Sequence, residues 1–508
     1  MNNEDVTFRT RHNTLVWWTG YVSVVVTGLV IAAYARRQYD APFLGLSLAI
    51  VVALVLGWVI RPLATLYTVL FLTAISDRVT VWWFPFAKNL SSAESISYVA
   101  DALTVSPLEL ALGTGFVVSL VRRYAESGRV LRPSPLTRPV VVFSAFVGYG
   151  FLRGIMLGGD LRIAVLEGRG LVYIGLMYAI VVNECTENAH LRRAVAAVLA
   201  GVLVQVLLSL EYLNRIDPAV RSDLESLTEH GSSLGHNLVI LMLLVFLVLG
   251  VRAWQWRWGL TIAVIPTMYV YLLSQRRSGV AALLVALGLV AVVLFWRSPR
   301  RFWFVVPAAT VLLVGYTLAF WNSASSIGFP AQAIKTVVAP DQASAKDQSS
   351  DLYRMVETFN VNFTIRSSPL FGLGFGLPFY QPVQLPNITT FDLAAYTPHN
   401  SILWLWIKTG FGGFAAMIYL FAKSLMLGAE RVRRMAHGPD LVVSIAAAAF
   451  VLMFAVYTWV DISWDARNTV FLGLALAICA RAPEPREMSA VAEDQSVADR
   501  TTPSMTSA

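Results

Sequence analysis

A histidine stands at the start of a long apolar run in the stretch "AYTPHNSILWLWIKTGFGG", residues 395–413. Pro398 stiffens the chain before His399, and Asn400 or Ser401 can cap the helix that the apolar run predicts. Imidazole exchanges protons near neutral pH, which suits a general base that activates a hydroxyl group. A histidine at a membrane interface can also be purely structural. His399 is therefore a candidate base, and the structural alternative stays open.

Arginines gather in segments that we expect to lie on the outer side of a membrane. They are Arg276 and Arg277 in "SQRRSGV", Arg354 and Arg366 in the segment before His399, and Arg153, Arg162 and Arg169. Guanidinium groups stay charged and match phosphate oxygens with two parallel hydrogen bonds, so such a group suits a diphosphate. We predict diphosphate binding by Arg277 and Arg354, with contributions from Arg276 and Arg169. Each arginine could instead reach the membrane interface or pair with a nearby acid.

Three glycines, Gly372, Gly374 and Gly376, alternate with large apolar residues in "SSPLFGLGFG". The run neither follows a recognisable strand nor opens a nucleotide-binding helix, so it is not a dinucleotide fingerprint. It predicts either a flexible turn that folds back onto the membrane or a stretch of bare backbone that approaches a bulky ligand. We group these glycines with Asn400 as residues that shape the site.

Other polar residues near the apolar runs invite weaker hypotheses. Lys408 follows His399 by about two helical turns and could join a relay or pair with a polar neighbour. Asp461 and Asp465, in "WVDISWDARN", are expected in a hydrated outer turn near Arg467, with a second acid site as the alternative. No HExxH, DxD or Cys/His cluster occurs on the predicted outer face, so we expect no metal and no cofactor.

The composition is that of a membrane protein. Of the 508 residues, 56% are hydrophobic and 14% are charged, and the mean hydropathy is +0.62. Soluble domains carry about 25% charged residues. The net charge of +8 arises from arginines in short loops between apolar runs, as the positive-inside rule expects. No basic tract is long enough to follow a nucleic-acid backbone, which excludes that class of partner.

The apolar runs predict an all-α polytopic membrane protein with about 12–14 transmembrane helices and one long extracytoplasmic loop. The candidate spans are 15–35, 42–60, 63–84, 106–121, 139–157, 169–184, 195–213, 236–251, 258–274, 279–296, 303–321, 401–425, 441–460 and 466–481. The basic loops place both termini in the cytoplasm.

Five regions follow from these spans: N-terminal helices in 1–138, central helices with the outer arginines in 139–321, the long extracytoplasmic loop in 322–400, C-terminal helices in 401–481, and a disordered cytoplasmic tail in 482–508. In the long loop we expect a flexible first part up to about residue 350. A short helix on the outer membrane surface and an ordered glycine turn should follow it.

The order of four motifs resembles the O-antigen ligase and polysaccharide polymerase family of polytopic membrane glycosyltransferases. "SQRRSGVAALL" is similar to the family's Ser/Arg/Gly helix start, with Arg277 at the position of the family arginine. "DLYRMVETF" supplies Arg354 before the glycine turn, "SSPLFGLGFG" is similar to that turn, and "HNSILWLWIKTGFGG" to the family's His-Asn element. The resemblance covers about residues 160–425. Arg276 departs from it, since the family usually has a small residue there.

The resemblance implies transfer of a glycan from a polyprenyl-diphosphate-linked donor to an acceptor hydroxyl of a glycan, lipid or protein. The reaction would serve cell-surface polysaccharide biosynthesis at the outer face of a bacterial inner membrane, without a nucleotide sugar or an obligatory metal. His399 would orient or deprotonate the acceptor while the arginines hold the leaving diphosphate. A ligase and a polymerase both fit. A transporter or flippase for a lipid-linked or anionic glycan is the alternative from a different class.

Overall fold

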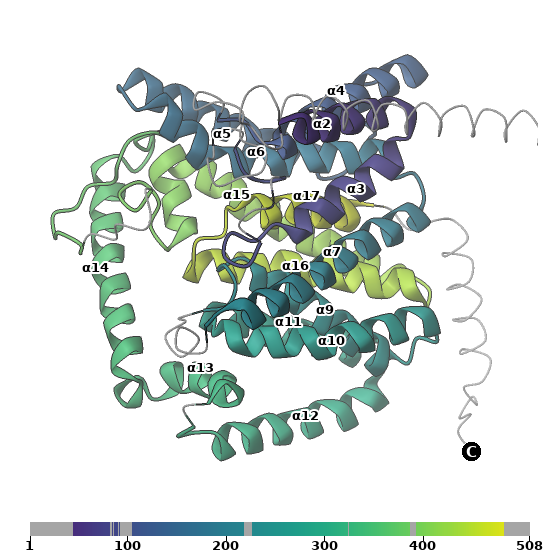
Figure 1. Ribbon diagram of the computed structural model, residues 1–508, viewed down its shortest axis with the longest axis vertical. Coiled ribbons are helices and arrows are strands. Elements are labelled where there is room, and N and C mark those ends of the chain that lie inside the picture. The colour runs from purple at the N-terminus through teal and green to yellow at the C-terminus, as the bar shows by residue number, and fades with distance from the viewer. Residues whose placement is uncertain are drawn as a thin grey trace, which may run out of the picture. The chain divides into compact units, whose positions relative to one another are not determined.

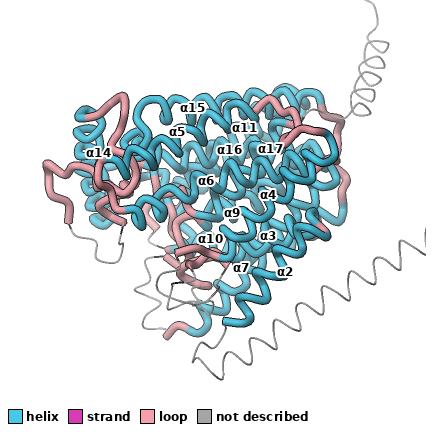
Figure 2. Tube along the Cα trace, turned by 90° about the horizontal axis from the view of Figure 1, so that it is seen from above, coloured by secondary structure: helices cyan, strands magenta, loops and turns pink. Residues whose placement is uncertain are grey.

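The computed structural model describes residues 44–81, 84, 86–89, 91, 104–217, 226–323, 325–386 and 393–481. These residues form α-helices, two short 3-10 helices and loops, with no β-strand among them (Figure 1, Figure 2). The predicted span at 15–35 and the predicted disordered tail at 482–508 lie outside the described residues.

Eight of the described helices are long and apolar enough to cross a membrane, which confirms an all-α polytopic membrane protein. They are α5 (Thr137–Met156), α6 (Leu161–Glu184), α7 (Asn188–Arg215), α9 (Ser232–Leu249), α11 (Arg277–Arg297), α12 (Pro299–Ala319), α15 (Ser401–Arg434) and α16 (Pro439–Val460). Five further helices coincide with predicted spans, namely α2 (Leu44–Ile60), α3 (Pro62–Ile75), α4 (Pro107–Ser127), α10 (Trp254–Ser274) and α17 (Ala466–Ala480). The span predicted at 63–84 is too long, because α3 ends at Ile75.

The chain divides into two compact units, and α6 contributes to both. The first unit comprises the described residues up to Arg132 and those from Leu176 to Ile216. In it α3 packs along α7, and α2 packs on α4. Arg122 of α4 binds Glu184 at 3.0 Å. This unit contains none of the predicted site residues.

The second unit, residues 133–175 and the described residues from Asp217 onward, is built around α16. This helix packs against α9, α11, α15 and α17, and most of its residues are buried. Small residues along α16 allow this close packing of helices, as is usual where lipid supplies no hydrophobic driving force. In contrast, α12 contacts chiefly α11 and α13 (Phe329–Val338), and its apolar side chains are almost all exposed. Such a helix suits a lipid environment.

The segment 322–400 is more helical than the sequence indicated. Its first part, expected to be flexible, forms the 3-10 helix η1 (Ser326–Gly328), α13 and the 3-10 helix η2 (Pro340–Gln342). The expectation overlooked α13, which packs through Ala333 and Phe329 onto Tyr271 and Val280 of the spanning helices and also buries Ala331.

The second part of this segment forms α14 (Ala345–Ser367), which has 23 residues and is not a short helix. Ser344 caps it by accepting a hydrogen bond from the Asp347 N–H at 3.1 Å. α14 runs across the ends of the spanning helices rather than alongside them (Figure 1). Its C-terminal half packs through Val361 and Ile365 onto Ile407 of α15. The helix therefore covers the end of the bundle at which α11 and α15 begin.

Candidate active site

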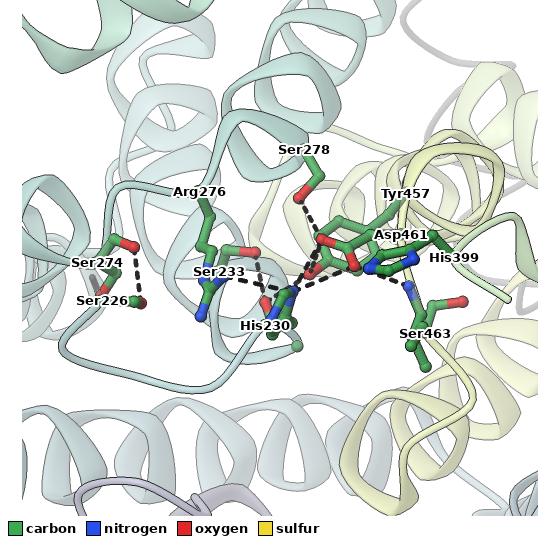
Figure 3. Close-up of polar contacts among 12 residues, drawn as sticks. Ser226, His230, Ser233, Ser274, Arg276, Ser278, His399, Tyr457, Asp461 and Ser463 are labelled. Carbon is green, nitrogen blue, oxygen red and sulfur yellow. Dashed lines mark hydrogen bonds and ion pairs between the residues drawn. The ribbon is translucent and has the colours of Figure 1, made fainter. Parts of the chain in front are cut away.

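Polar side chains meet where α11 and α15 begin and α16 ends, all within the second unit (Figure 3). The junction between α10 and α11 supplies Arg276, and the loop before α9 supplies His230. His399 lies two residues before the start of α15, and Asp461 is the C-cap of α16. In Figure 3 the two histidines lie on either side of Asp461. One end of the bundle thus gathers residues that are far apart in the sequence.

His399 is held by a buried carboxylate on α14. Its Nδ1 lies 3.1 Å from both carboxylate oxygens of Glu357, and its backbone N–H donates to Oε2 at 2.9 Å. The side chain of Glu357 is 4% exposed and that of His399 is 23% exposed. Tyr353, one turn earlier on α14, packs edge-on against the imidazole with 5.7 Å between ring centroids. The ring is therefore fixed in orientation.

This arrangement selects one tautomer of His399. A carboxylate only accepts hydrogen bonds, so Nδ1 carries the proton and Nε2 keeps its lone pair. Among the described residues, Nε2 has no hydrogen-bond partner. Asn400 caps α15 by accepting from the Leu403 N–H at 3.0 Å, as the sequence predicted. The geometry is that of an oriented imidazole, and Glu357 is a candidate site residue that the sequence did not single out.

Asp461 forms a second carboxylate–imidazole pair with His230. Both oxygens of the carboxylate lie 3.1 Å from His230 Nδ1, and Ser278 Oγ donates to Oδ2 at 3.0 Å. The expectation that Asp461 lies in a hydrated turn is wrong, because its side chain is only 2% exposed. Asp465 instead caps α17, accepting from the Asn468 N–H at 2.9 Å. A turn that is polar in sequence is buried here by the loop before α9.

The positive charges around Asp461 keep it ionised. Burial alone would raise the pKa of this carboxyl, but the charge and hydrogen bond of His230 act against burial. The charges of Arg354 and His399 act in the same direction, and the net result is a pKa well below the ordinary range of an aspartate. Asp461 is therefore a permanent anion between two imidazoles.

The predicted diphosphate arginines differ in what they bind. Arg277 is paired with α14: its guanidinium lies 3.0 Å from Asp351 Oδ1 and 3.5 Å from Asp347 Oδ1. Arg354 is half-buried and acts electrostatically on Asp461 but has no carboxylate partner within 4.0 Å among the described residues. Arg276 is also half-buried, with Nη1 3.4 Å from His230 Nδ1. These three arginines come from the elements that surround the two histidines.

The fourth predicted arginine, Arg169, lies on α6 and is half-buried. The next residue, Gly170, packs directly on the backbone carbonyl of Trp464, in the loop that follows Asp461. Its share in an anion site stays a prediction. Arg153, which the sequence placed in the same outer group, donates from Nε to the Gly372 carbonyl at 2.6 Å and is committed to the glycine turn.

The three glycines of the turn form an ordered contact between helices. Gly372, Gly374 and Gly376 have φ angles of 67°, 89° and 82°, a region that side chains disfavour. A Cβ atom on Gly374 would overlap the backbone of Gly154 on α5, and one on Gly372 would lie 2.6 Å from the Gly410 nitrogen on α15. The bare backbone is thus needed for packing between helices, and the turn contacts α15 at Ile407 and Gly410.

Lys408, the buried charge noted in the sequence, pairs with Glu167 of α6 at 2.8 Å, and both side chains are completely buried. Its Nζ also donates to the Leu377 carbonyl at 2.6 Å. Glu167 Oε2 accepts from the Gly376 N–H at 2.7 Å, and Oε1 accepts from the Trp404 indole at 3.3 Å. The pair therefore joins α6, α15 and the glycine turn, which is a positioning arrangement.

Among the described residues, no group of three His, Cys, Asp or Glu side chains could hold a metal ion. The site offers two oriented imidazoles and the guanidinium groups of Arg276, which also donates to the Thr228 carbonyl at 3.4 Å, and of Arg354. Chemically, it can bind a multiply charged anion and move protons beside it.

Comparison with known proteins agrees with the sequence motifs. The fold is that of a polytopic membrane protein whose His, Asp and Arg side chains gather at one end of its helices. Residues 262–418 match the family model described as O-antigen ligase, so this segment is similar to that family. The matched segment includes Arg276, Arg277, Arg354, Glu357 and His399. A search of curated proteins found no match to this chain.

Proposed function

We propose that the chain is a glycosyltransferase that moves a glycan from a polyprenyl-diphosphate carrier to an acceptor hydroxyl, in the manner of O-antigen ligases or polysaccharide polymerases. The observation that carries the proposal is the Glu357–His399 pair, which leaves His399 Nε2 without a partner among the described residues, inside the segment that matches the family. Arg354, in the same segment, acts electrostatically on Asp461, as His399 does. The reaction would take place at the extracytoplasmic face of a bacterial inner membrane, as the predicted topology implies.

In the proposed mechanism, His399 Nε2 accepts the proton of the acceptor hydroxyl as its oxygen attacks the anomeric carbon. The bond from that carbon to the diphosphate oxygen breaks, and the polyprenyl diphosphate leaves. Arg276 and Arg354 stabilise the charge that develops on the leaving group. Arg277 joins them only if the diphosphate displaces Asp351, because that carboxylate now occupies its guanidinium.

The glycine turn and the buried pair of Lys408 with Glu167 serve this chemistry indirectly. They fix α15 against α5 and α6, so the helix that begins two residues after His399 has one position. A general base must lie within hydrogen-bond reach of the proton it removes, which requires such rigidity.

The proposal is tested with the purified chain in lipid nanodiscs. The donor is glycan-bearing undecaprenyl diphosphate, and the acceptor is total membrane glycolipid, both extracted from a strain that lacks this chain. His399→Ala should reduce formation of glycosylated acceptor by about 10²- to 10⁴-fold. His437→Ala, at an exposed position outside the site, is the matched control and should retain wild-type activity.

A second variant addresses the arginines. Arg277→Lys should be poorly active, because an ammonium group cannot reproduce a planar two-pronged contact with phosphate.

Wild-type transfer by His399→Ala would remove His399 from the role of base.

The transport alternative gains no support from Lys408, whose charge is enclosed and neutralised by Glu167. Movement of the lipid-linked glycan across the bilayer without a covalent product would favour that alternative over transfer.

A further inference from the structure

The mechanism above leaves one imidazole of the site without a role. His230 lies beside Asp461 with Nδ1 3.1 Å from each carboxylate oxygen, and its side chain is 45% exposed. The two histidines are alike in their support, since each has a buried carboxylate at Nδ1. They differ in their second neighbours. His399 packs on Tyr353, whereas His230 lies beside Arg276.

The contacts fix how His230 can use its second nitrogen. Asp461 accepts from Nδ1, so that nitrogen carries a proton and cannot also accept one from Arg276, whose Nη1 lies 3.4 Å away. Nε2 has no hydrogen-bond partner among the described residues. The backbone of His230 is held as well: the Tyr457 hydroxyl donates to its carbonyl at 2.6 Å and Ser233 Oγ does so at 3.1 Å. Nε2 is thus a fixed and accessible position.

His230 lies between a buried carboxylate and an arginine that could hold an anion. Asp461 is buried, ionised and held by Ser278. Arg276 is a positive group in contact with the imidazole, with Nη1 3.4 Å from Nδ1. A diphosphate bound by Arg276 would bring at least two negative charges to the same place, and nearby negative charge favours the protonated form of an imidazole.

We infer that His230 is the proton donor to the leaving diphosphate, an inference that rests on the proposed function. Arg276 contacts this imidazole, with Nη1 3.4 Å from Nδ1, so a phosphate group bound by Arg276 would lie next to the ring. As the bond between the anomeric carbon and the diphosphate oxygen breaks, that oxygen keeps the electron pair and takes the proton from His230 Nε2. The acceptor proton goes to His399. His230 ends neutral and His399 ends protonated, and exchange with water restores both.

Transfer kinetics across the pH range test this inference in the full chain in nanodiscs, with the extracted donor and acceptor named above. The variant is His230→Gln, whose amide can still donate to Asp461 but cannot titrate. We expect kcat to fall by about 100-fold, while the KM for the donor changes much less. The wild type should lose activity at alkaline pH as His230 loses its proton, and His230→Gln should not show this loss. His437→Gln is the matched control and should behave as wild type.

His230→Arg separates proton donation from charge. An arginine keeps a positive charge beside the diphosphate but cannot release a proton. It should therefore remain poorly active. Wild-type activity of His230→Arg, or a His230→Gln variant that changes only KM, would overturn the inference in favour of simple anion binding.

A binding measurement keeps the inference testable apart from the proposed reaction. Farnesyl diphosphate serves as the probe, and its affinity is measured from pH 5.5 to 8.5 for the wild type, His230→Gln and His437→Gln. If His230 gives a proton to the bound anion, the affinity of the wild type for farnesyl diphosphate should fall as the pH rises. The fall should be steeper than that of His230→Gln by up to about tenfold per pH unit. Identical pH dependence in all three proteins would overturn the inference. Normal transfer by His230→Gln together with an inactive His399→Ala would overturn it while leaving the proposed function intact.

Discussion

Replacing Glu357 by glutamine removes the charge that orients His399 and hardly changes the size of the side chain. The carboxylate now accepts two hydrogen bonds from one residue, at 2.9 Å from the backbone N–H and at 3.1 Å from Nδ1 of His399. A glutamine has one acceptor oxygen and one amide donor. If the oxygen serves the backbone, the NH₂ group faces Nδ1, which must then accept, and the ring proton moves to Nε2.

The magnitude follows from that change of tautomer. With Nε2 protonated, His399 cannot take the acceptor proton, so the whole benefit of general-base catalysis is lost. Such a loss is worth about 10²- to 10⁴-fold in kcat, or about 2.7–5.5 kcal/mol in the activation free energy. The free energy of unfolding should fall by only about 1–3 kcal/mol, the cost of a poorly satisfied buried polar group.

The assay measures initial rates of glycan transfer and the affinity for farnesyl diphosphate in the same nanodisc preparation. Glu357→Gln should lower the rate and leave diphosphate affinity within about threefold of wild type, a change of less than 0.7 kcal/mol. Asp341→Asn, at an exposed aspartate of the same segment, is the control for loss of one carboxylate. A transfer rate of Glu357→Gln equal to that of the control would refute the orientation of His399 by Glu357.

Three further predictions concern the parts that hold the site. Gly374→Ala should lower the free energy of unfolding by about 2–4 kcal/mol through backbone overlap and strain; Gly158→Ala, also at positive φ but with open space around it, should cost only the strain. Lys408→Met should cost about 3–5 kcal/mol because it leaves Glu167 buried without a partner. Adding Glu167→Gln to Lys408→Met should recover most of that loss in the free energy of unfolding. Asp351→Asn should raise affinity for farnesyl diphosphate by up to about fivefold, since it releases an arginine from a surface ion pair worth about 0.2–1 kcal/mol.

Each of these predictions has a distinct contrary result. Equal stability of the two alanine variants would mean that the glycine turn is not close-packed. A double variant of Lys408→Met with Glu167→Gln that is as unstable as Lys408→Met alone would show that the buried charge of Glu167 does not cause the loss of stability. Weaker diphosphate binding by Asp351→Asn would mean that Asp351 does not compete with the ligand for Arg277.

The membrane helices follow from the sequence because their signal is local. A run of apolar residues of sufficient length must be helical in lipid, where each backbone polar group needs an internal partner. The cap of α15 is equally local: Asn400 reaches only to the Leu403 N–H. The position of α14 after the flexible-looking stretch was predicted, although its length of 23 residues was not.

The partners within the site are not local, and the sequence did not reveal them. His399 and Glu357 are 42 residues apart, and His230 and Asp461 are 231 residues apart. Asp461 in particular resembles an ordinary turn residue, and only the fold buries it. One signal was available: Asp347, Asp351 and Arg354 recur at helical spacing, which predicts that one face of α14 is polar and turned to a partner.

The most direct measurement is an experimental structure of the chain with farnesyl diphosphate bound. Our proposal predicts the diphosphate between Arg276 and Arg354, with one oxygen near His230 and with His399 free to face an acceptor hydroxyl. A diphosphate bound elsewhere on the chain, with both histidines remote from it, would contradict the proposed site.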